Sequence, residues 1–214
     1  MINLIHGDCM EYMATLKDNE FDLAVVDPPY GIKINTQIKK SSFYRCDVND
    51  KAIDHEWDDK IPPPEYFVEL MRVSKYQIIW GGNYFLDYLS NTRCMLVWDK
   101  NNGTNPMADC ELAWTNLNSA VRKFTYHHLQ ESGPNNQTNR IHPTQKPVRL
   151  YQWIFDRFTK QGWRILDTHL GSGSSAIAAH DCGLEFVGVE LDSDYFQAAK
   201  DRLERHQLQL QLPW

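Results

Sequence analysis

A short turn near the N-terminus carries residue types suited to chemistry on a planar amine. The segment Asp27-Pro28-Pro29-Tyr30 directly follows the apolar run Phe21 to Val26. Two prolines fix φ and remove two N–H groups, so the turn is stiff and presents only acceptors, the Asp27 carboxylate and the Pro28 carbonyl. These acceptors suit the two hydrogens of an –NH₂ group, while the Tyr30 ring could stack on the ring that carries it. A purely structural interpretation, a rigid strand-end turn with a solvated Asp27, stays open at this point.

A second turn, near the C-terminus, is rich in glycine. Gly171 and Gly173 lie between the apolar pair Ile165-Leu166 and a helical stretch from Ser174. Glycines let the backbone turn tightly and approach a ligand closely. Another apolar strand ends at Glu190, 19 residues after Gly171, and a carboxylate at that offset can accept hydrogen bonds from a ribose diol. The pattern favours a nucleoside cofactor over a plain strand–helix turn.

The elements that must position these turns alternate between short apolar strands and amphipathic helices. We predict strands at Ile2 to Ile5, Phe21 to Val26, Tyr76 to Trp80, Met95 to Trp98, Arg164 to Leu166 and Phe186 to Val189, and an antiparallel pair formed by Glu111 to Trp114 and Ala120 to Tyr126. We predict helices from Asp8, with Glu11 as its capping-box partner, and at Pro64 to Ser74, Pro147 to Thr159, Ser174 to His180 and Ser193 to His206. This alternation favours an α/β domain with a largely parallel sheet.

The two turns together resemble motifs of the amino-group DNA methyltransferases that use S-adenosylmethionine. In that family (Asp/Asn/Ser)-Pro-Pro-(Tyr/Phe) is the catalytic motif, and the Asp-Pro-Pro-Tyr form is typical of adenine methylation. Three further segments resemble family motifs, namely His6-Gly7-Asp8-Cys9, His142-Pro143-Thr144-Gln145-Lys146-Pro147 and Phe186-Val187-Gly188-Val189-Glu190-Leu191-Asp192. The catalytic motif precedes the glycine motif, which resembles the circularly permuted, β-type arrangement. The resemblance spans nearly the whole chain.

The resemblance implies a Rossmann-like class I methyltransferase fold, with a mostly parallel seven-stranded sheet and an antiparallel strand pair. It also implies S-adenosyl-L-methionine as cofactor and methyl transfer to the exocyclic N-6 amine of adenine in double-stranded DNA after base flipping. Its catalytic residues would be Asp27, Pro28, Pro29 and Tyr30. Its cofactor-binding residues would be Asp8, Cys9, Asp27, His142, Thr144, Lys146, Asp167, Leu170, Gly171, Ser172, Gly173, Ser174, Glu190 and Leu191. The chain departs from the family at Thr168-His169, where Pro-Phe is usual, and at Ser174, where Thr is usual, and the role of His169 stays open.

Charge is unevenly spread along the chain. The formal net charge is −6 and the pI about 5.7, which rules out a protein that coats nucleic acid by general basicity. Residues 30–51 nevertheless carry five Lys and Arg against two acids, and residues 116–150 carry five against one, whereas residues 1–29 carry one Lys against six acids. The two basic stretches predict phosphate contacts, and charge alone would also place Lys146 on a phosphate. The predicted DNA-contacting residues are Lys33, Lys39, Lys40, Arg45, Arg122, Lys123 and Arg140, with Asn136 as a reader of base edges.

Length and composition predict one catalytic domain, residues 1–214, with inserts at about 33–60 and 101–141 as DNA-contact or target-recognition segments. Neither a signal peptide nor an apolar run of roughly 20 residues is found, so we expect no membrane contact and a location in a bacterial or phage-infected host cytoplasm. The five cysteines form no Cys-x-x-Cys pair, and no metal is expected. The small size resembles a solitary phage or prophage enzyme. A restriction partner and a homodimer stay open.

Other functions remain open on sequence alone. Methylation of the exocyclic N-4 amine of cytosine uses the same chemistry, and related Asn-Pro-Pro-Tyr turns occur in RNA and protein-amide methyltransferases. A nicotinamide dehydrogenase is disfavoured because Ala176 stands where a dinucleotide fingerprint has its third glycine. Carbon-5 cytosine methylation would need a Pro-Cys motif, which the sequence lacks. A DNA-binding module without catalysis is disfavoured because the proposed catalytic residues are all present.

Overall fold

The computed structural model describes residues 1–33, 58–103, 108–127, 141–142 and 144–209. The strands are β1 (Ile2–His6), β2 (Phe21–Val26), β3 (Ser74–Trp80), β4 (Cys94–Asp99), β5 (Cys110–Thr115), β6 (Arg122–Thr125), β7 (Arg164–Asp167) and β8 (Glu185–Glu190). The helices are α1 (Cys9–Ala14), α3 (Pro64–Val73), α4 (Val148–Phe158), α5 (Ser174–Asp181) and α6 (Ser193–Gln209), with a short 3₁₀ helix, η2 (Gly82–Tyr84). The predicted strands and helices are therefore confirmed, with ends that differ by a few residues.

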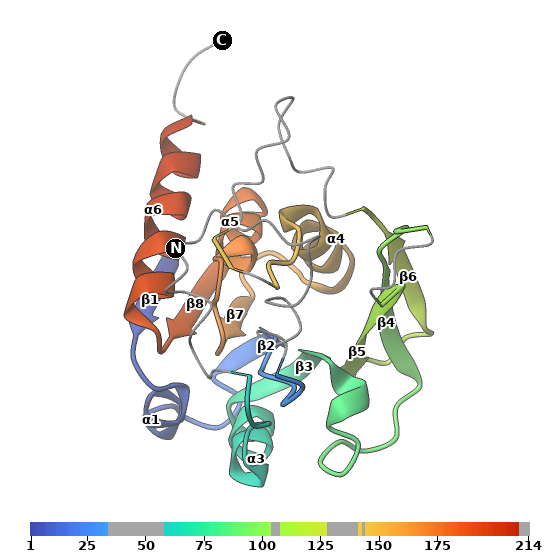
Figure 1. Ribbon diagram of the computed structural model, residues 1–214. Coiled ribbons are helices and arrows are strands. Elements are labelled where there is room, and N and C mark those ends of the chain that lie inside the picture. The colour runs from blue at the N-terminus through green and yellow to red at the C-terminus, as the bar shows by residue number, and fades with distance from the viewer. Residues whose placement is uncertain (34–57, 104–107, 128–140, 143, 210–214) are drawn as a thin grey trace.

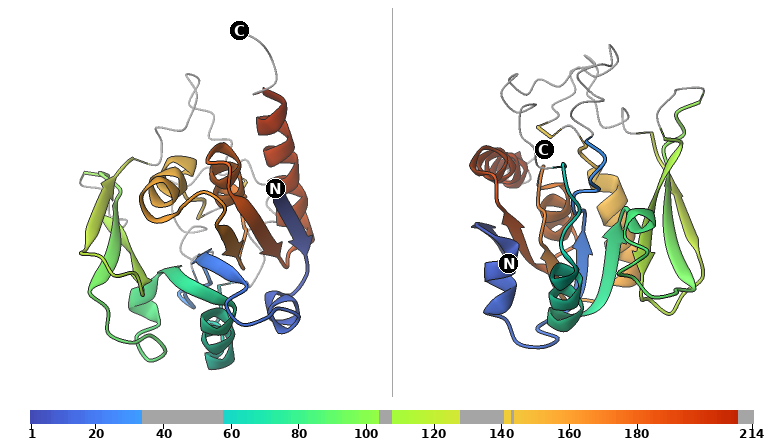
Figure 2. Two further views of the ribbon diagram at one scale, coloured as in Figure 1. Left: turned by 180° about the vertical axis from the view of Figure 1, so that it is seen from behind. Right: turned by 60° about the horizontal axis from the view of Figure 1, so that its bottom comes forward.

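One sheet organises the described residues, in the order β1-β8-β7-β2-β3-β5-β4-β6 (Figure 1). The strands from β1 to β3 in this order are all parallel, and β5 is antiparallel to both β3 and β4. In Figure 2, β1 and α6 lie at one side of the molecule and β4, β5 and β6 at the other. The predicted mostly parallel α/β sheet is confirmed, with eight strands where seven were expected.

The predicted antiparallel pair is wrong. Strand β5 is bonded on one side to β3, with Ile79 opposite Trp114, and on the other side to β4, with Val97 opposite Leu112. Both edges of β5 are thus occupied, so β6 adds instead to the free edge of β4, in parallel, with Leu96 opposite Arg122. The expectation rested on closeness in sequence, which does not report that a strand has already used both of its hydrogen-bonding edges.

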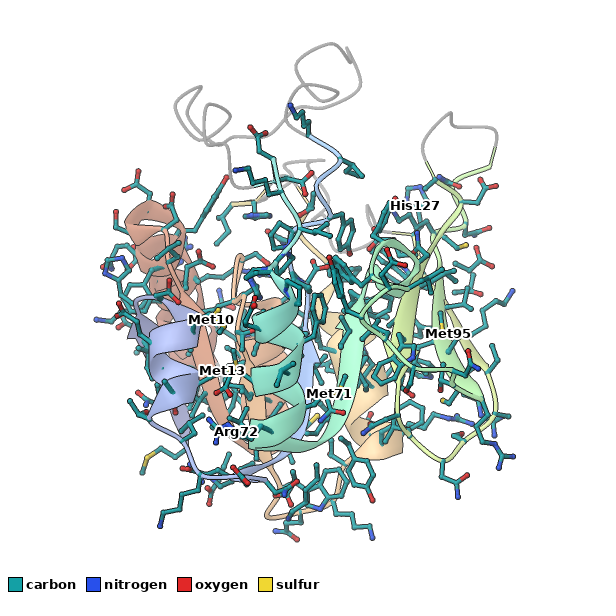
Figure 3. The ribbon with its side chains drawn as sticks, turned by 90° about the horizontal axis from the view of Figure 1, so that it is seen from below. Met10, Met13, Met71, Arg72, Met95 and His127 are labelled. Carbon is teal, nitrogen blue, oxygen red and sulfur yellow. The ribbon has the colours of Figure 1, made fainter. Side chains whose placement is uncertain are left out.

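Helices cover both faces of the sheet, which makes three layers (Figure 1). Helices α4, α5 and α6 pack on one face around Ile154, Ala178 and Leu203, and α1 and α3 pack on the other around Met13 and Leu70. Figure 3 shows Met13 between α1 and α3. The two helices are also joined because Arg72 of α3 donates to the carbonyl oxygens of Met13, at 2.9 Å, and Leu16, at 2.8 Å. None of the described helices is long and apolar enough to cross a membrane.

The parallel strands bring the sequence motifs to one edge of the sheet. Strands β1, β8, β7 and β2 are consecutive neighbours and run in the same direction. Their carboxyl ends are followed by the segment at Asp8, by Glu190, by the glycine turn after Asp167, and by the proline turn at Asp27. Open α/β sheets bind ligands outside this edge. The fold therefore gathers four motifs that lie up to 182 residues apart in the chain (Asp8 to Glu190).

Candidate active site

The carboxylate of Asp27 is the centre of the site. It stands at the carboxyl end of β2, and its side chain is 19% exposed, which leaves it accessible from the sheet edge. The hydroxyl of Tyr30 donates to Asp27 Oδ1 at 2.6 Å, and Lys146 Nζ donates to Oδ2 at 2.5 Å. Each carboxylate oxygen thus has one partner and keeps further lone-pair capacity for another donor. The arrangement is a fixed acceptor that is partly exposed.

A series of alternating charges extends from Asp27 through Lys146 to Glu111 and Lys100. Lys146 Nζ lies 3.0 Å from Glu111 Oε2, and Lys100 Nζ lies 2.7 Å from Glu111 Oε1. Lys146 comes from the segment just before α4, whereas Glu111 is near the start of β5, which is antiparallel and so begins at the carboxyl edge of its neighbours. The side chain of Lys146 is only 3% exposed. The four groups carry two positive and two negative charges, so the cluster around the buried lysine is neutral when all are ionised.

The neighbours of each group in this series of charges decide whether its pKa is raised or lowered. Burial raises the pKa of Asp27 above the usual range of an aspartate, and the single cation at Lys146 offsets this only in part. Burial acts in the same direction on Glu111, but the two cations Lys146 and Lys100 outweigh it and hold the pKa of Glu111 at about 2. Burial lowers the pKa of Lys146, but Asp27 and Glu111 outweigh it and raise that pKa above its ordinary value. The central lysine is therefore charged.

Both the ring and the backbone of Tyr30 are held by other segments. Its ring stacks on Tyr84 of η2 with centroids 4.9 Å apart and planes at 16°. On another side it lies against the backbone of Gly81, where any Cβ would overlap the ring. The backbone N–H groups of Tyr30 and Gly31 both donate to Asp58 Oδ1, at 2.7 and 3.0 Å. Because Asp58 is itself buried, the proline turn is fixed from outside as well as by its own rings.

The glycine turn is built mainly from backbone and short side chains. Asp167 ends β7 and accepts from the hydroxyl of Ser175 at 2.6 Å and from the backbone N–H of His169 at 3.0 Å. Its side chain is buried, and burial raises the pKa of Asp167 to about 7. Gly171 and Gly173 have φ of 50° and 72°, in the left-handed region that favours glycine. A Cβ at Gly173 would lie 3.1 Å from Ala199 Cβ of α6, so this glycine also lets the turn pack against that helix.

The ends of β1 and β8 complete one side of the site. Glu190 Oε2 accepts from the N–H of Gly171 at 2.7 Å, and Oε1 accepts from the N–H of Asp192 at 3.0 Å. The predicted cap of α1 is confirmed, since Asp8 Oδ1 accepts from the N–H of Met10 at 2.6 Å. Beside it, burial raises the pKa of the Cys9 thiol to about 12, so this cysteine is a neutral thiol. Leu170 and Ser172 are buried in the turn, whereas Leu191 is exposed.

Two histidines flank the glycine turn as neutral rings. His142 packs against Tyr195 of α6, with centroids 4.5 Å apart, and its Nδ1 lies 3.1 Å from Thr144 Oγ1. Burial, with Lys146 in addition, lowers the pKa of His142 to about 3. His169, where the family has Phe, lies edge-on to Tyr66 and has its Nδ1 3.0 Å from Thr168 Oγ1. Burial lowers the pKa of His169 to about 4, so its ring is uncharged like the phenyl ring it replaces.

The residues predicted to contact DNA are described only in part. Lys33 follows the proline turn with φ of 54°, and its N–H donates to the carbonyl of Asp58 at 3.1 Å. Arg122 and Lys123 lie on the outermost strand, β6, and Lys123 pairs with Asp99 at 3.0 Å. Lys39, Lys40, Arg45, Asn136 and Arg140 lie outside the described residues. Within the described residues there is no group of three or more His, Cys, Asp or Glu side chains that could hold a metal ion.

Sequence reasoning missed four side chains of the site. Asp58 and Tyr84 contact Tyr30, Glu111 contacts Lys146, and Lys100 contacts Glu111. None of the four belongs to one of the five motifs. The one available signal was at Glu111, a carboxylate at the start of an apolar strand-like run, which needs a cation if buried. Asp58 and Tyr84 follow no periodicity that separates them from ordinary loop residues.

The fold and this arrangement of turns define a class I methyltransferase with a Rossmann-like sheet. The model of the DNA methylase family N6_N4_Mtase matches residues 75–201, which is more than half of the chain, and the chain belongs to this family. The putative methylase YubD of Escherichia coli K12 is 28% identical over 99% of this chain and 94% of that protein. The type II methyltransferase M2.DpnII of Streptococcus pneumoniae is 25% identical over 94% of this chain and 89% of that protein.

Solved structures show the same fold. The complex of M1.HpyAVI with SAM has a TM-score of 0.57 at 21% identity and covers 95% of this chain and 100% of that one. The cytosine-N4-specific PvuII DNA methyltransferase has a TM-score of 0.62 at 12% identity, over 96% of this chain and 90% of that one. TTHA0409 of Thermus thermophilus, a putative DNA modification methylase, has a TM-score of 0.60 at 20% identity, over 96% of this chain and 95% of that one.

Proposed function

We propose that the protein transfers a methyl group from S-adenosyl-L-methionine to the exocyclic N-6 amine of adenine in double-stranded DNA. The observation that carries the proposal is the position of Asp27 relative to the glycine turn. Strands β2 and β7 are neighbours, with Leu23 opposite Ile165 and Ala24 opposite Leu166. The proline turn and the glycine turn therefore follow two bonded neighbours, and neighbouring strands lie about 4.8 Å apart. An amine held at the first turn and a methyl donor held at the second would meet across one strand boundary.

The residues around the glycine turn fit this cofactor. A Cβ built on Gly171 would meet no atom closer than 3.8 Å, so a ligand can come close to the backbone there. The carboxylate of Glu190 lies beside it and suits the hydroxyls of a ribose. When bound, the cofactor supplies an electrophilic methyl group carried on a sulfonium. Of the cofactor residues that the resemblance implies, Asp27 and Lys146 are assigned to the target amine below. The other twelve are proposed to bind the cofactor, namely Asp8, Cys9, His142, Thr144, Asp167, Leu170, Gly171, Ser172, Gly173, Ser174, Glu190 and Leu191.

The chain's own part in the reaction is to hold the amine. The lone pair of an aromatic amine is conjugated with its ring, which makes the nitrogen a poor nucleophile. Asp27 Oδ1 and the Pro28 carbonyl, accepting its two hydrogens, would favour a pyramidal nitrogen with its lone pair directed outward. Their negative charge is also aimed at the positive charge that develops on nitrogen during attack. The proton becomes acidic only after transfer, so Asp27 needs no unusual basicity to accept it.

The target amine lies inside a duplex, so the base has to leave the stack. The Tyr30 ring is the proposed stacking partner of the base, and Tyr84, which is 43% exposed, stacks on that ring. The Asp-Pro-Pro-Tyr form of the turn supports adenine, because the family resemblance associates that form with adenine methylation. Pro29 contributes by keeping Pro28 extended, which fixes the direction of its carbonyl.

Contacts to the DNA backbone are proposed for the two basic stretches. The residues that flank 34–57, 104–107 and 128–140 belong to connections that leave or enter the sheet at its carboxyl edge, after β2, between β4 and β5, and after β6. The predicted contacts are Lys33, Lys39, Lys40, Arg45, Arg122, Lys123, Asn136 and Arg140. Each phosphate contact that is removed should lower the salt dependence of DNA binding by about 0.9 in slope.

Labelled methyl transfer tests the proposal. The purified protein is incubated with duplex DNA of mixed sequence and S-adenosylmethionine carrying a labelled methyl group, and the DNA is digested to nucleosides for mass spectrometry. The expected product is N6-methyladenine. Parallel reactions with RNA and with a protein extract should take up no label. Absence of label in every nucleic acid would overturn the proposal.

Methylation of the N-4 amine of cytosine is the second candidate. It is supported by the fold shared with the cytosine-N4-specific PvuII enzyme, and by the fact that Asp27 and the Pro28 carbonyl would hold either exocyclic amine. The same digestion separates the two products by mass. Label found only in N4-methylcytosine would keep the cofactor and the role of Asp27 and replace the target base.

A further inference from the structure

The ammonium of Lys146 is enclosed by groups of the protein. Its Nζ donates to Asp27 Oδ2 at 2.5 Å and to Tyr30 Oη at 3.3 Å, and it forms an ion pair with Glu111 Oε2 at 3.0 Å. The side chain is 3% exposed, and it also lies under the rings of Trp80 and Tyr30, at 5.5 and 5.7 Å from their centroids. A DNA phosphate or a cofactor carboxylate could reach it only by breaking this arrangement.

The two oxygens of Asp27 have different partners, and Lys146 bonds only one of them. It occupies Oδ2, and Oδ1 is left with the hydroxyl of Tyr30. Glu111 holds Lys146 from the opposite direction, and Lys100 in turn neutralises Glu111. A carboxylate with one oxygen tied to a buried, anchored cation cannot rotate freely, so its second oxygen keeps one direction.

We propose that Lys146 is a positioning residue that keeps Asp27 ionised and directs its Oδ1 toward the target amine, and that Glu111 sets how much of the positive charge of Lys146 acts on Asp27. The proposal rests on the proposed function, in which Asp27 accepts the hydrogens of the amine. It differs from the two roles that sequence alone suggests for Lys146, a cofactor contact and a phosphate contact. A protonated Asp27 would present a hydrogen-bond donor to the amine. Loss of Lys146 should favour this protonated form, so Asp27 would no longer accept a hydrogen from the amine.

The charged and titratable groups that act on Asp27 come from several elements. They are Tyr30 on its own turn, Lys146 before α4, Glu111 on β5 with Lys100 behind it, Tyr66 on α3, Tyr151 on α4 and Asp167 on β7. Lys146 and Lys100 are the cations among them, and of these two only Lys146 touches Asp27. Removal of Lys146 should therefore raise the pKa of Asp27. Removal of the charge of Glu111 should lower it, because Glu111 is a nearby anion.

Two variants test this opposition. In Lys146→Met, the acid limb of the pH profile of kcat should move to higher pH by about 1–3 pH units, the usual effect of an adjacent opposite charge, with roughly tenfold loss on that limb per unit. In Glu111→Gln, the acid limb should move to lower pH. Lys146→Arg should return the limb toward the wild-type position. A merely structural role would lower the rate in both variants without moving the limb in opposite directions.

Binding measurements separate the competing roles of Lys146. Calorimetry should give the same Kd for S-adenosylmethionine in wild type and Lys146→Met, and the salt dependence of DNA binding should be unchanged. Lys75→Met is the matched control, because Lys75 pairs with Asp22 at 2.8 Å at the opposite edge of the sheet and is half exposed. A weaker cofactor Kd with an unmoved pH limb, or a salt slope reduced by about 0.9, would overturn the inference.

A readout without turnover keeps the inference separate from the proposed function. The ¹³C carboxyl resonance of Asp27, assigned by its loss in Asp27→Asn, reports ionisation directly in the protein alone. It should titrate at higher pH in Lys146→Met and at lower pH in Glu111→Gln. If wild type transfers no methyl group but these titrations shift as stated, the proposed function fails and the electrostatic role stands. If Lys146→Met does not fold, Lys146→Arg and Glu111→Gln carry the test, and an unmoved Asp27 titration in Glu111→Gln contradicts it.

Discussion

The proline turn after β2 and the glycine turn after β7 are neighbours in the sheet, but they are held by different means. The glycine turn is fixed partly by residues close to it in sequence, because Asp167 accepts from Ser175 and from the N–H of His169. It is also held at its backbone by Glu190, which accepts from the N–H of Gly171, and by Arg202, which donates to the carbonyl of Ser172. The proline turn is fixed by side chains from far along the chain. Lys146 is 119 residues from Asp27, and Asp58 is 28 residues from Tyr30.

The difference follows from what each turn has to present. A turn that lets a ligand approach its backbone closely needs residues in the left-handed region, which glycine supplies locally. A turn that offers a charged acceptor must keep a partly buried carboxylate ionised, and this requires a cation at a fixed place. Near Asp27 that cation is Lys146, and it needs Glu111 as its own second partner. The glycine turn therefore acts through the shape of its backbone and is called the backbone turn below. The proline turn acts through the charge of Asp27 and is called the electrostatic turn.

The largest effect is expected where the electrostatic turn loses its charge. Asp27→Asn keeps the shape of the side chain but removes the negative acceptor, so methyl transfer should fall by about 10²–10³-fold or more, the usual cost of one electrostatic group at a reacting centre. The rate is measured by label transfer at saturating DNA and S-adenosylmethionine. Asp22→Asn is the control, because Asp22 lies on the same strand at the opposite edge, paired with Lys75. Activity of Asp27→Asn equal to that of Asp22→Asn would remove Asp27 from the mechanism.

The pH dependence of stability tests two groups at or near the backbone turn, Asp167 and His142, whose pKa values are shifted in opposite directions. Asp167 has its pKa raised from 3.8 to about 7, so the native state binds the proton more tightly, and its contribution to stability declines as pH rises from about 4 to about 7. His142 has its pKa lowered from 6.5 to about 3, so its contribution is complete above about 6.5 and is lost as pH falls toward 3.

Each group contributes at most about 1.4 kcal/mol per pH unit. Urea unfolding between pH 4 and pH 6.5 should show that the stability of Asp167→Asn rises more steeply with pH than that of wild type. The stability of His142→Gln should rise less steeply than that of wild type. Slopes that change in the same direction in both variants would contradict the assignment of a protonated Asp167 beside a neutral His142.

The comparison also explains how far sequence reasoning reached. Strand β2 was predicted with the bounds Phe21–Val26 that the structure has, and Asp8 caps α1 as predicted, because apolar runs and caps are local signals. The meeting of the motifs at one sheet edge followed from parallel topology. Glu111 and Asp58 could not be found in this way, since no local pattern encodes a contact between distant segments. The pairing of β6 with β4 was missed for the same reason.

Within the backbone turn, the two glycines should differ in what they cost when replaced. Gly173→Ala combines left-handed strain of about 1–2 kcal/mol with a Cβ only 3.1 Å from Ala199 Cβ, whereas Gly171→Ala brings the strain into open space. Urea unfolding should rank Gly173→Ala as the less stable, and calorimetry should show weaker cofactor binding in Gly171→Ala. Gly183→Ala, with φ of 66° and no atom within 4 Å, measures strain alone. Equal loss of stability in all three would remove the packing role of Gly173.

The smallest effect is expected from Tyr30→Phe, which divides the electrostatic turn into its two supports. The variant removes the hydroxyl that donates to Asp27 Oδ1 at 2.6 Å and keeps the ring that stacks on Tyr84. Lys146 still holds Oδ2, so the carboxylate stays ionised and loses only part of its orientation. A single hydrogen bond contributes about 0.5–1.5 kcal/mol, which predicts a roughly two- to tenfold lower kcat. Tyr30→Ala also loses the stacking surface for the base and should lose more, by about 1–3 kcal/mol. If Tyr30→Phe were as inactive as Asp27→Asn, the hydroxyl would take part in the reaction itself, and the buried lysine would not be the main support of the carboxylate.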